Sequence, residues 1–497
     1  MRALEHLEPE RVFHYFEEIC RIPHGSGNTR QISDYLAAFA AEHGLQYRQE
    51  TCGNVIIRKP AAPGYEQADL VMLQGHMDMV AVKTRDCDLD LEKEGLRPAV
   101  TGDGKWVYAE GTSLGGDDGI AVAYALAILE DDTLIHPELE VVLTVDEEIG
   151  LLGASALDAG DLRSRILLNM DSEDDGIFLT SCAGGATVEC LAEAPSEEVS
   201  GVVYEWRVEG LQGGHSGSDI HLGRANANLI FGRFLAQVSE TAEFSVGDFA
   251  GGEKDNAIAS GCRAIFVAAP SEARKLEHEA EIFAGMIRAE YAGVDPGMNL
   301  VLDRLEQNHA RILTSEGKKN LMTLLEHLPS GIQRMMPEMP EMVQTSLNLG
   351  VLRLKGTEIS LTYSVRSSSA AEKAWLIKRM RDLCGLTGGR CRISGEYPAW
   401  EFRADSRIQR IMAETYEEMT GEKPVLTGIH AGVECGILSE KLPGIDCISY
   451  GPQMKDIHTP RERLEIASVK KNYELTLRVL EKLAKKNSCQ EEGFCVL

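Results

Sequence analysis

The chain has 497 residues, which is long for a single hydrophobic core, so we expect two or more domains. Hydrophobic residues make up 43% of the sequence and charged residues 26%, as in ordinary water-soluble globular proteins. With 78 acidic and 50 basic residues the formal net charge is −28, and a surface of that sign repels the phosphates of nucleic acids. We therefore expect no nucleic-acid partner.

The sequence carries no secretion or membrane signal that we recognise. Residues 1–23 are charged throughout and lack the uninterrupted apolar core of a signal peptide. No run approaches the roughly 18 apolar residues of a membrane-spanning helix. The 12 cysteines are scattered without C-x-x-C pairs, as expected for reduced thiols. A cytoplasmic location with no membrane partner is predicted.

The first predicted elements are two helices and two strands, and the second strand is followed by polar residues. Residues 7–22 and 31–42 are predicted helices, and 55–58 a short strand. The apolar run 70–73 predicts a strand buried on both faces, followed by His76 and Asp78, whose side chains share one side of an extended chain. That spacing lets a carboxylate hold the second ring nitrogen of a metal-binding imidazole. Taken alone, His-x-Asp at a strand end is more often without function.

A glycine-rich loop follows a stretch, residues 81–110, that we expect to be irregular and exposed. Residues 111–119 read G-T-S-L-G-G-D-D-G and open a helix, 120–130, that is apolar almost all round and therefore predicted to be buried. A phosphate-binding loop is the alternative interpretation. Asp117 and Asp118 argue against it, because they already supply the negative charge that a helix N-terminus attracts. Asp117 is better suited to a cation.

Further strands end in the same way. The strand predicted at 139–145 is followed by Glu147 and Glu148, that at 166–170 by Asp171, and that at 445–450 by His458. The alternation of strands and helices predicts a mostly parallel sheet flanked by helices, and ligands bind at the carboxyl ends of such strands. The repetition favours one shared site.

Between about residues 186 and 390 the pattern changes. Strands at 202–208, 264–269 and 359–365 alternate polar and apolar residues, which is typical of an antiparallel sheet with one wet face. We therefore predict a discontinuous first domain, residues 1–186 and 391–497, and an inserted α+β domain at 187–390.

The residues at the strand ends suit a metal centre. Imidazoles with carboxylates favour zinc, with manganese or cobalt as alternatives, over calcium or copper. Five candidate ligands are too many for one tetrahedral ion, so two divalent ions sharing a carboxylate are the simpler arrangement. Such a centre polarises a carbonyl and lowers the pKa of a bound water towards ~7. Because adjacent residues diverge, Glu148 can bind metal while Glu147 faces the water as a general base.

These motifs resemble those of the M20 metallopeptidases over nearly the whole chain. The metal-site motifs are His76-Met77-Asp78, Gly115-Gly116-Asp117-Asp118-Gly119, Asp146-Glu147-Glu148-Ile149-Gly150, Asn169-Met170-Asp171 and Ile457-His458-Thr459-Pro460. Within that family the chain is most similar to the bacterial aminoacyl-histidine (Xaa-His) dipeptidases, through Gly213-Gly214-His215-Ser216-Gly217, Asn256-Ala257-Ile258, Ser346-Leu347-Asn348-Leu349-Gly350 and His430-Ala431-Gly432-Val433-Glu434-Cys435-Gly436. Relatives often have Asn at the position of Asp118 and Pro-Arg at Ala259-Ser260.

The resemblance implies a catalytic domain of zinc-exopeptidase type with an inserted lid and dimerisation domain. It implies that His76 and Asp171 hold one ion and that Glu148 and His458 hold the other. Asp117 bridges them, Glu147 is the general base, and Asp78 orients His76. The substrate residues it implies are His215 for the oxyanion, in cis or from a partner subunit, Arg366 for the terminal carboxylate, and Asn256 and Gly432 as lining of the same pocket.

The predicted function is hydrolysis of small dipeptides, Xaa-His such as carnosine, by a homodimeric two-metal enzyme. The alternatives on the same scaffold are an N-acyl amino acid amidohydrolase and a di- or tripeptidase of other specificity. A catalytically inactive binding or scaffold protein is the alternative outside enzymes. Its sign would be the loss of Glu147 or of a ligand, and the sequence keeps all of them.

Overall fold

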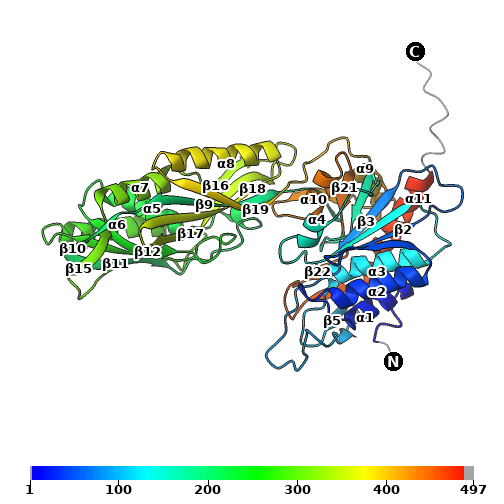
Figure 1. Cartoon of the computed structure of the whole chain (residues 1–497). Helices are drawn as coiled ribbons and strands as arrows, with labels where there is room; N and C mark the ends of the chain where they lie inside the picture. The colour runs from blue at the N-terminus through cyan, green and yellow to red at the C-terminus, as the bar shows by residue number, and fades with distance from the viewer. Residues whose placement is uncertain (1–2, 486–497) are drawn as a thin grey trace, which may run out of the picture. The chain divides into compact units, whose positions relative to one another are not determined.

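The computed structural model describes residues 3–485 (Figure 1). The chain forms two compact units. Within the described residues, the first unit comprises residues 3–181, Phe402–Gly428 and residues 433–485. The second unit comprises Cys182–Glu401 and Ile429–Gly432. None of the helices in the described residues combines the length and the hydrophobicity needed to cross a lipid bilayer.

The first unit combines a large sheet with helices. Its elements in chain order are α1 (Glu10–Cys20), α2 (Arg30–Glu42), β1 (Gln46–Gln49), β2 (Val55–Lys59), β3 (Val71–His76), β4 (Pro98–Val100), β5 (Trp106–Ala109), α3 (Gly116–Glu130), β6 (Leu139–Thr144), α4 (Leu152–Ala156), β7 (Ile166–Asn169), β8 (Ile177–Cys182), α9 (Arg407–Thr420), β20 (Val425–Ile429), α10 (Glu434–Lys441), β21 (Asp446–Ser449), β22 (Met454–Lys455), β23 (Arg463–Glu465) and α11 (Ile466–Lys485).

The eight-stranded sheet of this unit has the order β1-β2-β6-β3-β7-β21-β8-β20. Its centre, β6-β3-β7-β21, is parallel, and the flanking pairs β2–β6 and β21–β8 are antiparallel. Every residue of the four central strands is buried, which explains why apolar residues occupy both faces of each strand. The predicted mostly parallel sheet is confirmed.

Helix α3 lies in the core of the first unit, packed against α1 and β3. All of its residues except Glu130 are buried. The prediction of a helix that is buried on all sides is therefore correct. Because α3 starts at Gly116, its first turn also carries Asp117 and Asp118 into the interior.

The expectation that residues 81–110 are irregular and exposed is wrong in part. Strands β4 and β5 form a four-stranded sheet with β22 and β23, in the order β22-β23-β5-β4. Val107 and Ala109 of β5 are buried. Strands β4 and β5 pair with each other locally, but β5 also pairs with β23, which lies far along the chain, and no local pattern predicts that second pairing.

The second unit is built on antiparallel strands. Its elements are β9 (Gly184–Glu193), β10 (Ser196–Ser200), β11 (Val202–Glu209), the 3-10 helix η1 (Ile220–Leu222), α5 (Ala227–Val238), β12 (Ser245–Gly251), β13 (Cys262–Ala268), α6 (Ala273–Glu290), β14 (Asn299–Arg304), β15 (His309–Leu313), α7 (Ser315–His327), β16 (Gly331–Met335), β17 (Val343–Lys355), β18 (Glu358–Ser367), α8 (Ala370–Gly385) and β19 (Arg390–Tyr397).

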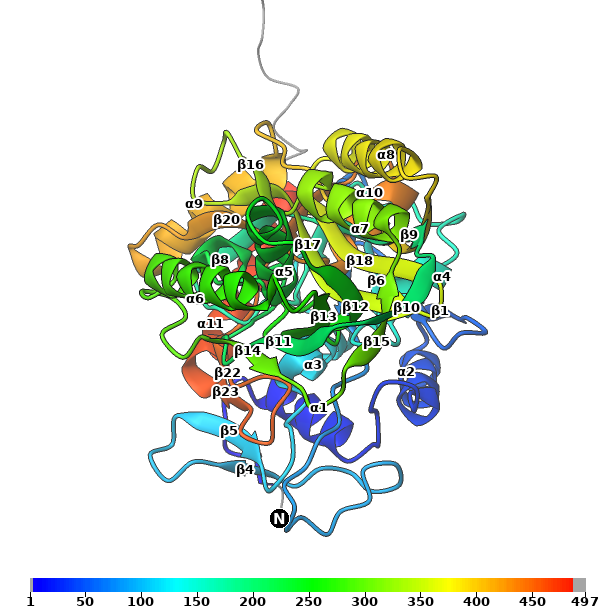
Figure 2. The ribbon, with the colours of Figure 1, turned by 90° about the vertical axis from the view of Figure 1, so that its left-hand side faces the viewer.

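Nine of these strands form an antiparallel sheet, β14-β11-β13-β12-β17-β18-β9-β19, with β16 paired to β17, and the other two, β10 and β15, pair with each other. Helices α5 to α8 pack against the sheet (Figure 2). Their buried side chains form one hydrophobic core with those of the sheet. The predicted antiparallel α+β architecture is confirmed. The second unit extends to Glu401, beyond the expected boundary at 390, because β19 pairs with β9. Most residues of β19 are exposed, so its membership in this sheet depends on a partner two hundred residues earlier.

Candidate functional site

One edge of the parallel sheet in the first unit gathers acidic and imidazole side chains. His76 is the last residue of β3, Glu147 and Glu148 follow β6, and Asp171 follows β7. Since these strands are parallel, their carboxyl ends meet at the same edge. The loop between β22 and β23 adds His458 to this group.

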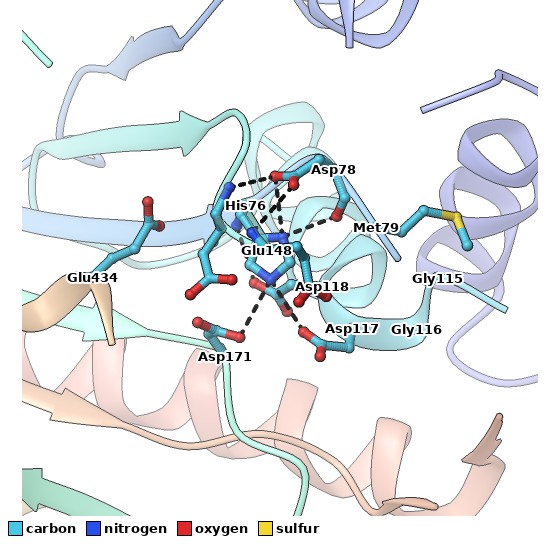
Figure 3. Close-up of polar contacts among 12 residues, drawn as sticks. His76, Asp78, Met79, Gly115, Gly116, Asp117, Asp118, Glu148, Asp171 and Glu434 are labelled. Atoms are coloured by element: carbon cyan, nitrogen blue, oxygen red, sulfur yellow. Dashed lines mark hydrogen bonds and ion pairs between the residues drawn. The ribbon is translucent and has the colours of Figure 1, made fainter. Parts of the chain in front are cut away.

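The side chains meet in overlapping groups whose ligand atoms all lie within 4.8 Å of one another: His76 with Asp117 and Asp171, Asp117 with Glu148 and His458, and His76 with Glu147 and Glu148. Asp117 lies in the middle. Its Oδ1 is 3.1 Å from Nε2 of His76, and its Oδ2 is 3.1 Å from Nε2 of His458. Figure 3 shows Asp117 and Asp171 converging on the His76 imidazole.

These spacings fit metal coordination. Two ligand atoms at about 2.0–2.1 Å from a tetrahedral zinc ion are roughly 3.3 Å apart. His76 Nε2 lies 3.6 Å from Asp171 Oδ1, and His458 Nε2 lies 2.9 Å from Glu148 Oε1. No Lys or Arg of residues 3–485 forms an ion pair with these carboxylates. The carboxylates therefore lack Lys or Arg partners, and bound metal cations would neutralise their negative charge.

The neighbouring carboxylates raise the pKa values of both imidazoles. Hydrogen bonds with Asp117 and Glu148 raise the pKa of His458 to about 10. Burial opposes protonation of His76, yet the carboxylates of Asp117, Asp171 and Asp78 raise its pKa well above the usual range. Protons on the two imidazoles balance the acids in the absence of a cation, and a metal ion would take over that role and release them.

Crowding of like charges also affects the remaining carboxyls. Burial, with added repulsion from Asp171, raises the pKa of Glu147 well above its ordinary value. Burial and the neighbouring acids raise the pKa of Asp171 to about 6, although His76 opposes this shift. A carboxyl with a raised pKa is suited to accepting a proton near neutral pH.

Asp78 contacts both the imidazole and the loop after β6. The nearest oxygen to His76 Nδ1 is the main-chain carbonyl of Asp78, at 2.9 Å, and the carboxylate Oδ1 follows at 3.5 Å. The carboxylate accepts hydrogen bonds from Ser26 Oγ at 2.8 Å and from the backbone N–H of Glu147 at 3.0 Å. Asp78 therefore supports the imidazole mainly through its backbone and the glutamate loop through its side chain.

Two buried acids beside this group were absent from the predicted site. Asp118 accepts the backbone N–H of His76 at 3.2 Å, and burial raises its pKa well above the ordinary value. Glu434, the first residue of α10, accepts hydrogen bonds from Thr144 Oγ1 at 2.6 Å and from Gln74. Its pKa is raised to about 7, chiefly by burial. Glu434 lies in the motif His430-Ala431-Gly432-Val433-Glu434-Cys435-Gly436, in which the sequence analysis predicts a substrate-binding role for Gly432 only.

Glu462 is a third acid that sequence reasoning did not find. Its carboxylate accepts the backbone N–H groups of Leu114 and Gly116 at 2.8 Å, and those of Gly115 and Asp117 at 3.2 and 3.4 Å. The N–H groups of the glycine-rich loop thus bind a carboxylate of the same chain. No spacing in the sequence links residues so far apart.

In the second unit, polar side chains surround Arg366, which is only 7% exposed. Its Nη1 donates to Tyr397 Oη at 3.0 Å, and its Nη2 lies 3.3 Å from His215 Nε2. Its buried Nε has no hydrogen-bond partner among the described residues. His430 also belongs to this group, with its Nε2 2.7 Å from Ser346 Oγ. Burial and the charge of Arg366 lower the pKa of His430 to about 3.

The other two predicted substrate residues join this group only indirectly. The main-chain carbonyl of Asn256 accepts the backbone N–H of Ser216, and its side chain is exposed. A Cβ at Gly432 would lie 2.7 Å from the Tyr397 ring, so the glycine permits close packing against that ring. The structure therefore brings His215 and Arg366 into contact and leaves the Asn256 side chain outside.

Comparison with known proteins gives consistent matches. A family model described as peptidase family M20/M25/M40 matches residues 72–482. The cytosol non-specific dipeptidase of Escherichia coli K12 is 34% identical over 488 residues, 98% of this chain and 100% of that protein. The crystal structure of an aminoacylhistidine dipeptidase from Vibrio alginolyticus superposes with a TM-score of 0.90 at 34% identity, covering 96% and 97% of the two chains. An aminopeptidase PepT from Bacillus cereus, at 16% identity, shares the fold with a TM-score of 0.56 over 96% of this chain and 100% of that one.

Proposed function

The chain belongs to peptidase family M20/M25/M40, and from that membership we propose that it is a metallo-dipeptidase that hydrolyses small dipeptides with a free carboxylate. The names of its relatives, a non-specific dipeptidase and an aminoacylhistidine dipeptidase, make Xaa-His dipeptides such as carnosine the first substrates to test. We further propose that it acts in the cytoplasm as a homodimer, with the second unit as lid and dimerisation domain.

The proposal depends above all on the position of Asp117. Its two carboxylate oxygens face different imidazoles, each at 3.1 Å, which supports a bridge between two divalent ions. His76 and Asp171 would hold one ion, and Glu148 and His458 the other. Zinc suits this set of nitrogen and oxygen donors, and manganese or cobalt would also fit. When bound, the ions supply positive charge that polarises the scissile carbonyl and acidifies a water molecule.

Glu147 would act as the general base. Its backbone is held by the carboxylate of Asp78, and burial raises its pKa, so it binds a proton more readily than an exposed glutamate does. Glu147 would take the proton from the attacking water and return it to the amine nitrogen that leaves. Such proton transfer contributes roughly 10²–10⁴-fold to a rate.

Arg366 and His215 would bind the anionic parts of the substrate. Nδ1 of His215 accepts the backbone N–H groups of Gly217 and Ser218 at 3.3 and 3.2 Å, so the ring proton is on Nε2. That N–H faces the Arg366 guanidinium, so two donors converge on the same space. Burial and Arg366 lower the pKa of His215, which keeps the ring neutral. Convergent donors favour oxygen acceptors, and we assign Arg366 to the terminal carboxylate and His215 to the oxyanion.

The test is an assay of full-length protein reconstituted with Zn²⁺ or Mn²⁺. Carnosine and other Xaa-His dipeptides should be cleaved, whereas N-acetyl amino acids should not. Preferential cleavage of N-acetyl amino acids would replace the proposal with an amidohydrolase of the same family. No hydrolysis of either panel by metal-replete dimer would indicate a binding protein.

A further inference from the structure

The second unit contains a group of three cysteines that the dipeptidase proposal does not use. Cys190 on β9, Cys391 on β19 and Cys384 in the last turn of α8 have sulfur atoms within 4.8 Å of one another. Cys190 and Cys391 are directly opposite each other on paired antiparallel strands, and their sulfurs are 3.2 Å apart. We propose that these three thiols form a binding site for a thiophilic d¹⁰ cation such as Zn²⁺ or Cu⁺.

The geometry requires little change to hold an ion. Three sulfurs at about 2.3 Å from a common metal are roughly 3.8–4.0 Å apart. The closest pair in the structure is 3.2 Å apart, and none of the three distances exceeds 4.8 Å. Movements of under about 1 Å for each sulfur would therefore give trigonal coordination, within the range of ordinary rotamer adjustment.

The backbone holds Cys384 against the strand pair. Its sulfur is 3.6 Å from the carbonyl of Leu191 and 3.5 Å from that of Arg390, the residues adjacent to Cys190 and Cys391. A Cβ at residue 389 would lie 2.8 Å from the Cys384 sulfur and 2.4 Å from the Leu191 carbonyl. Gly389 is thus what lets the helix end approach the sheet edge this closely.

The cluster is buried except at the edge strand. Cys190 and Cys384 are fully buried in the hydrophobic core, and Cys391 is half-buried at the edge strand, which leaves a route for an ion. Hydrogen bonds within the cluster lower the pKa of Cys384 and raise that of Cys190, so a metal ion would displace thiol protons as it binds. Soft thiolate sets select Zn²⁺ and Cu⁺ over Mg²⁺ or Ca²⁺. A bound ion would fasten α8 to the β9–β19 edge.

A disulfide between Cys190 and Cys391 is the competing use of these residues, since opposed strand positions fall within disulfide reach. A disulfide would leave Cys384 without a role. The convergence of the third sulfur, together with the close approach that Gly389 permits, favours metal binding.

The experiment is an anaerobic titration of the reduced, full-length protein with Cd²⁺, followed by ultraviolet absorption of sulfur-to-metal charge transfer. Our proposed catalytic centre contains only nitrogen and oxygen donors, so ions bound there do not produce this band. We expect a band that saturates at one ion per chain. It should be lost in Cys384→Ser and in Cys391→Ser, and kept in the controls Cys52→Ser, which is exposed, and Cys262→Ser, which is buried elsewhere.

X-ray absorption of the Cd²⁺-loaded wild type provides a test that does not depend on the folding of variants, and three sulfur neighbours are expected. Absence of the band, its persistence in both cluster variants, or fewer than three sulfurs would overturn the proposal. So would mass spectrometry showing that the pair Cys190–Cys391 oxidises to a disulfide while the reduced protein binds no Cd²⁺. These readouts are independent of dipeptide hydrolysis, so the two proposals can fail separately.

Discussion

Asp78 accepts a hydrogen bond from the backbone N–H of Glu147, with 3.0 Å between Oδ1 and the nitrogen. The same residue offers its main-chain carbonyl to His76. One aspartate therefore ties the position of the proposed general base to that of a proposed metal ligand. Replacing the carboxylate while keeping its shape should disturb the glutamate loop more than His76, because the backbone carbonyl that contacts the imidazole stays in place.

For Asp78→Asn we expect a loss of roughly 10–100-fold in kcat or in metal affinity, the range seen when a group supporting a metal site is altered. The amide oxygen of Asn can still accept the N–H of Glu147, but its nitrogen cannot accept the N–H of Glu148, and the negative charge beside His76 is lost. Metal content and kcat should be measured together, with the exposed Asp88→Asn as the control. Wild-type values of both in Asp78→Asn would show that the carboxylate does not position the loop.

Glu147→Gln should lower kcat by at least roughly 10²-fold, because the amide cannot take up the proton of the attacking water. Metal content, measured by elemental analysis, should remain near that of the wild type. Glu148→Gln is the matched variant, one residue away, and should instead lose metal, since Glu148 is the partner of His458. If Glu147→Gln kept most of its activity, the general-base assignment would be wrong.

Arg366→Lys should raise KM for dipeptides by roughly 10-fold or more and leave kcat less affected, because a lysine cannot make the bidentate contact of a guanidinium with a carboxylate. Dipeptide amides, which lack that carboxylate, should be poor substrates for the wild type and should lose little more in the variant. Arg353→Lys, on the neighbouring strand β17, serves as control. Equal losses with acid and amide substrates would refute the assignment.

Glu462→Ala should destabilise the first unit by about 2–4 kcal/mol. The substitution leaves buried backbone N–H groups of the glycine-rich loop without an acceptor. Urea unfolding of metal-free protein measures this loss directly, and half-buried Glu465→Ala is the control. A change below about 0.5 kcal/mol would show that water replaces the carboxylate.

The second unit should lose stability in acid through His430. Burial and Arg366 lower its pKa to about 3 in the folded state, against about 6.5 when unfolded. The folded form thus binds fewer protons, and its stability is complete above about pH 6.5 and falls as the pH drops towards 3. The slope is roughly 1.4 kcal/mol per pH unit between these limits. Urea midpoints at several pH values, with hydrogen exchange in β17 and β18 as probe, should show a slope that is reduced in His430→Gln and unchanged in the exposed His278→Gln.

Much of the fold could be predicted because a buried strand has a locally apolar sequence. Strands β3, β6 and β7 are buried and each contains a run of three apolar residues, at 71–73, 141–143 and 166–168, and a parallel arrangement then places His76, Glu148 and Asp171 at one edge. In contrast, β5 is short and β19 is mostly exposed, and each pairs with a strand hundreds of residues away, although β5 also pairs with the nearby β4. The long-range pairing depends on tertiary contacts, and no periodic pattern of apolar residues predicts it.

The same distinction applies to single side chains. Glu462 binds a loop about 345 residues earlier, and Cys190 meets Cys391 across 201 residues, so nothing in their neighbourhood marks them. The contact of His76 with the backbone rather than the carboxylate of Asp78 is equally invisible, because alternation fixes the side of a strand and not the rotamer of a side chain.

The order in which the chain is synthesised follows from the discontinuity of the first unit. Asp171 precedes the second unit and His458 follows it, so a ribosome completes the whole of Cys182–Glu401 before the last proposed ligand emerges. The insertion can begin folding while its host is still unfinished. Incorporation of the full metal complement therefore has to wait until translation has passed residue 458.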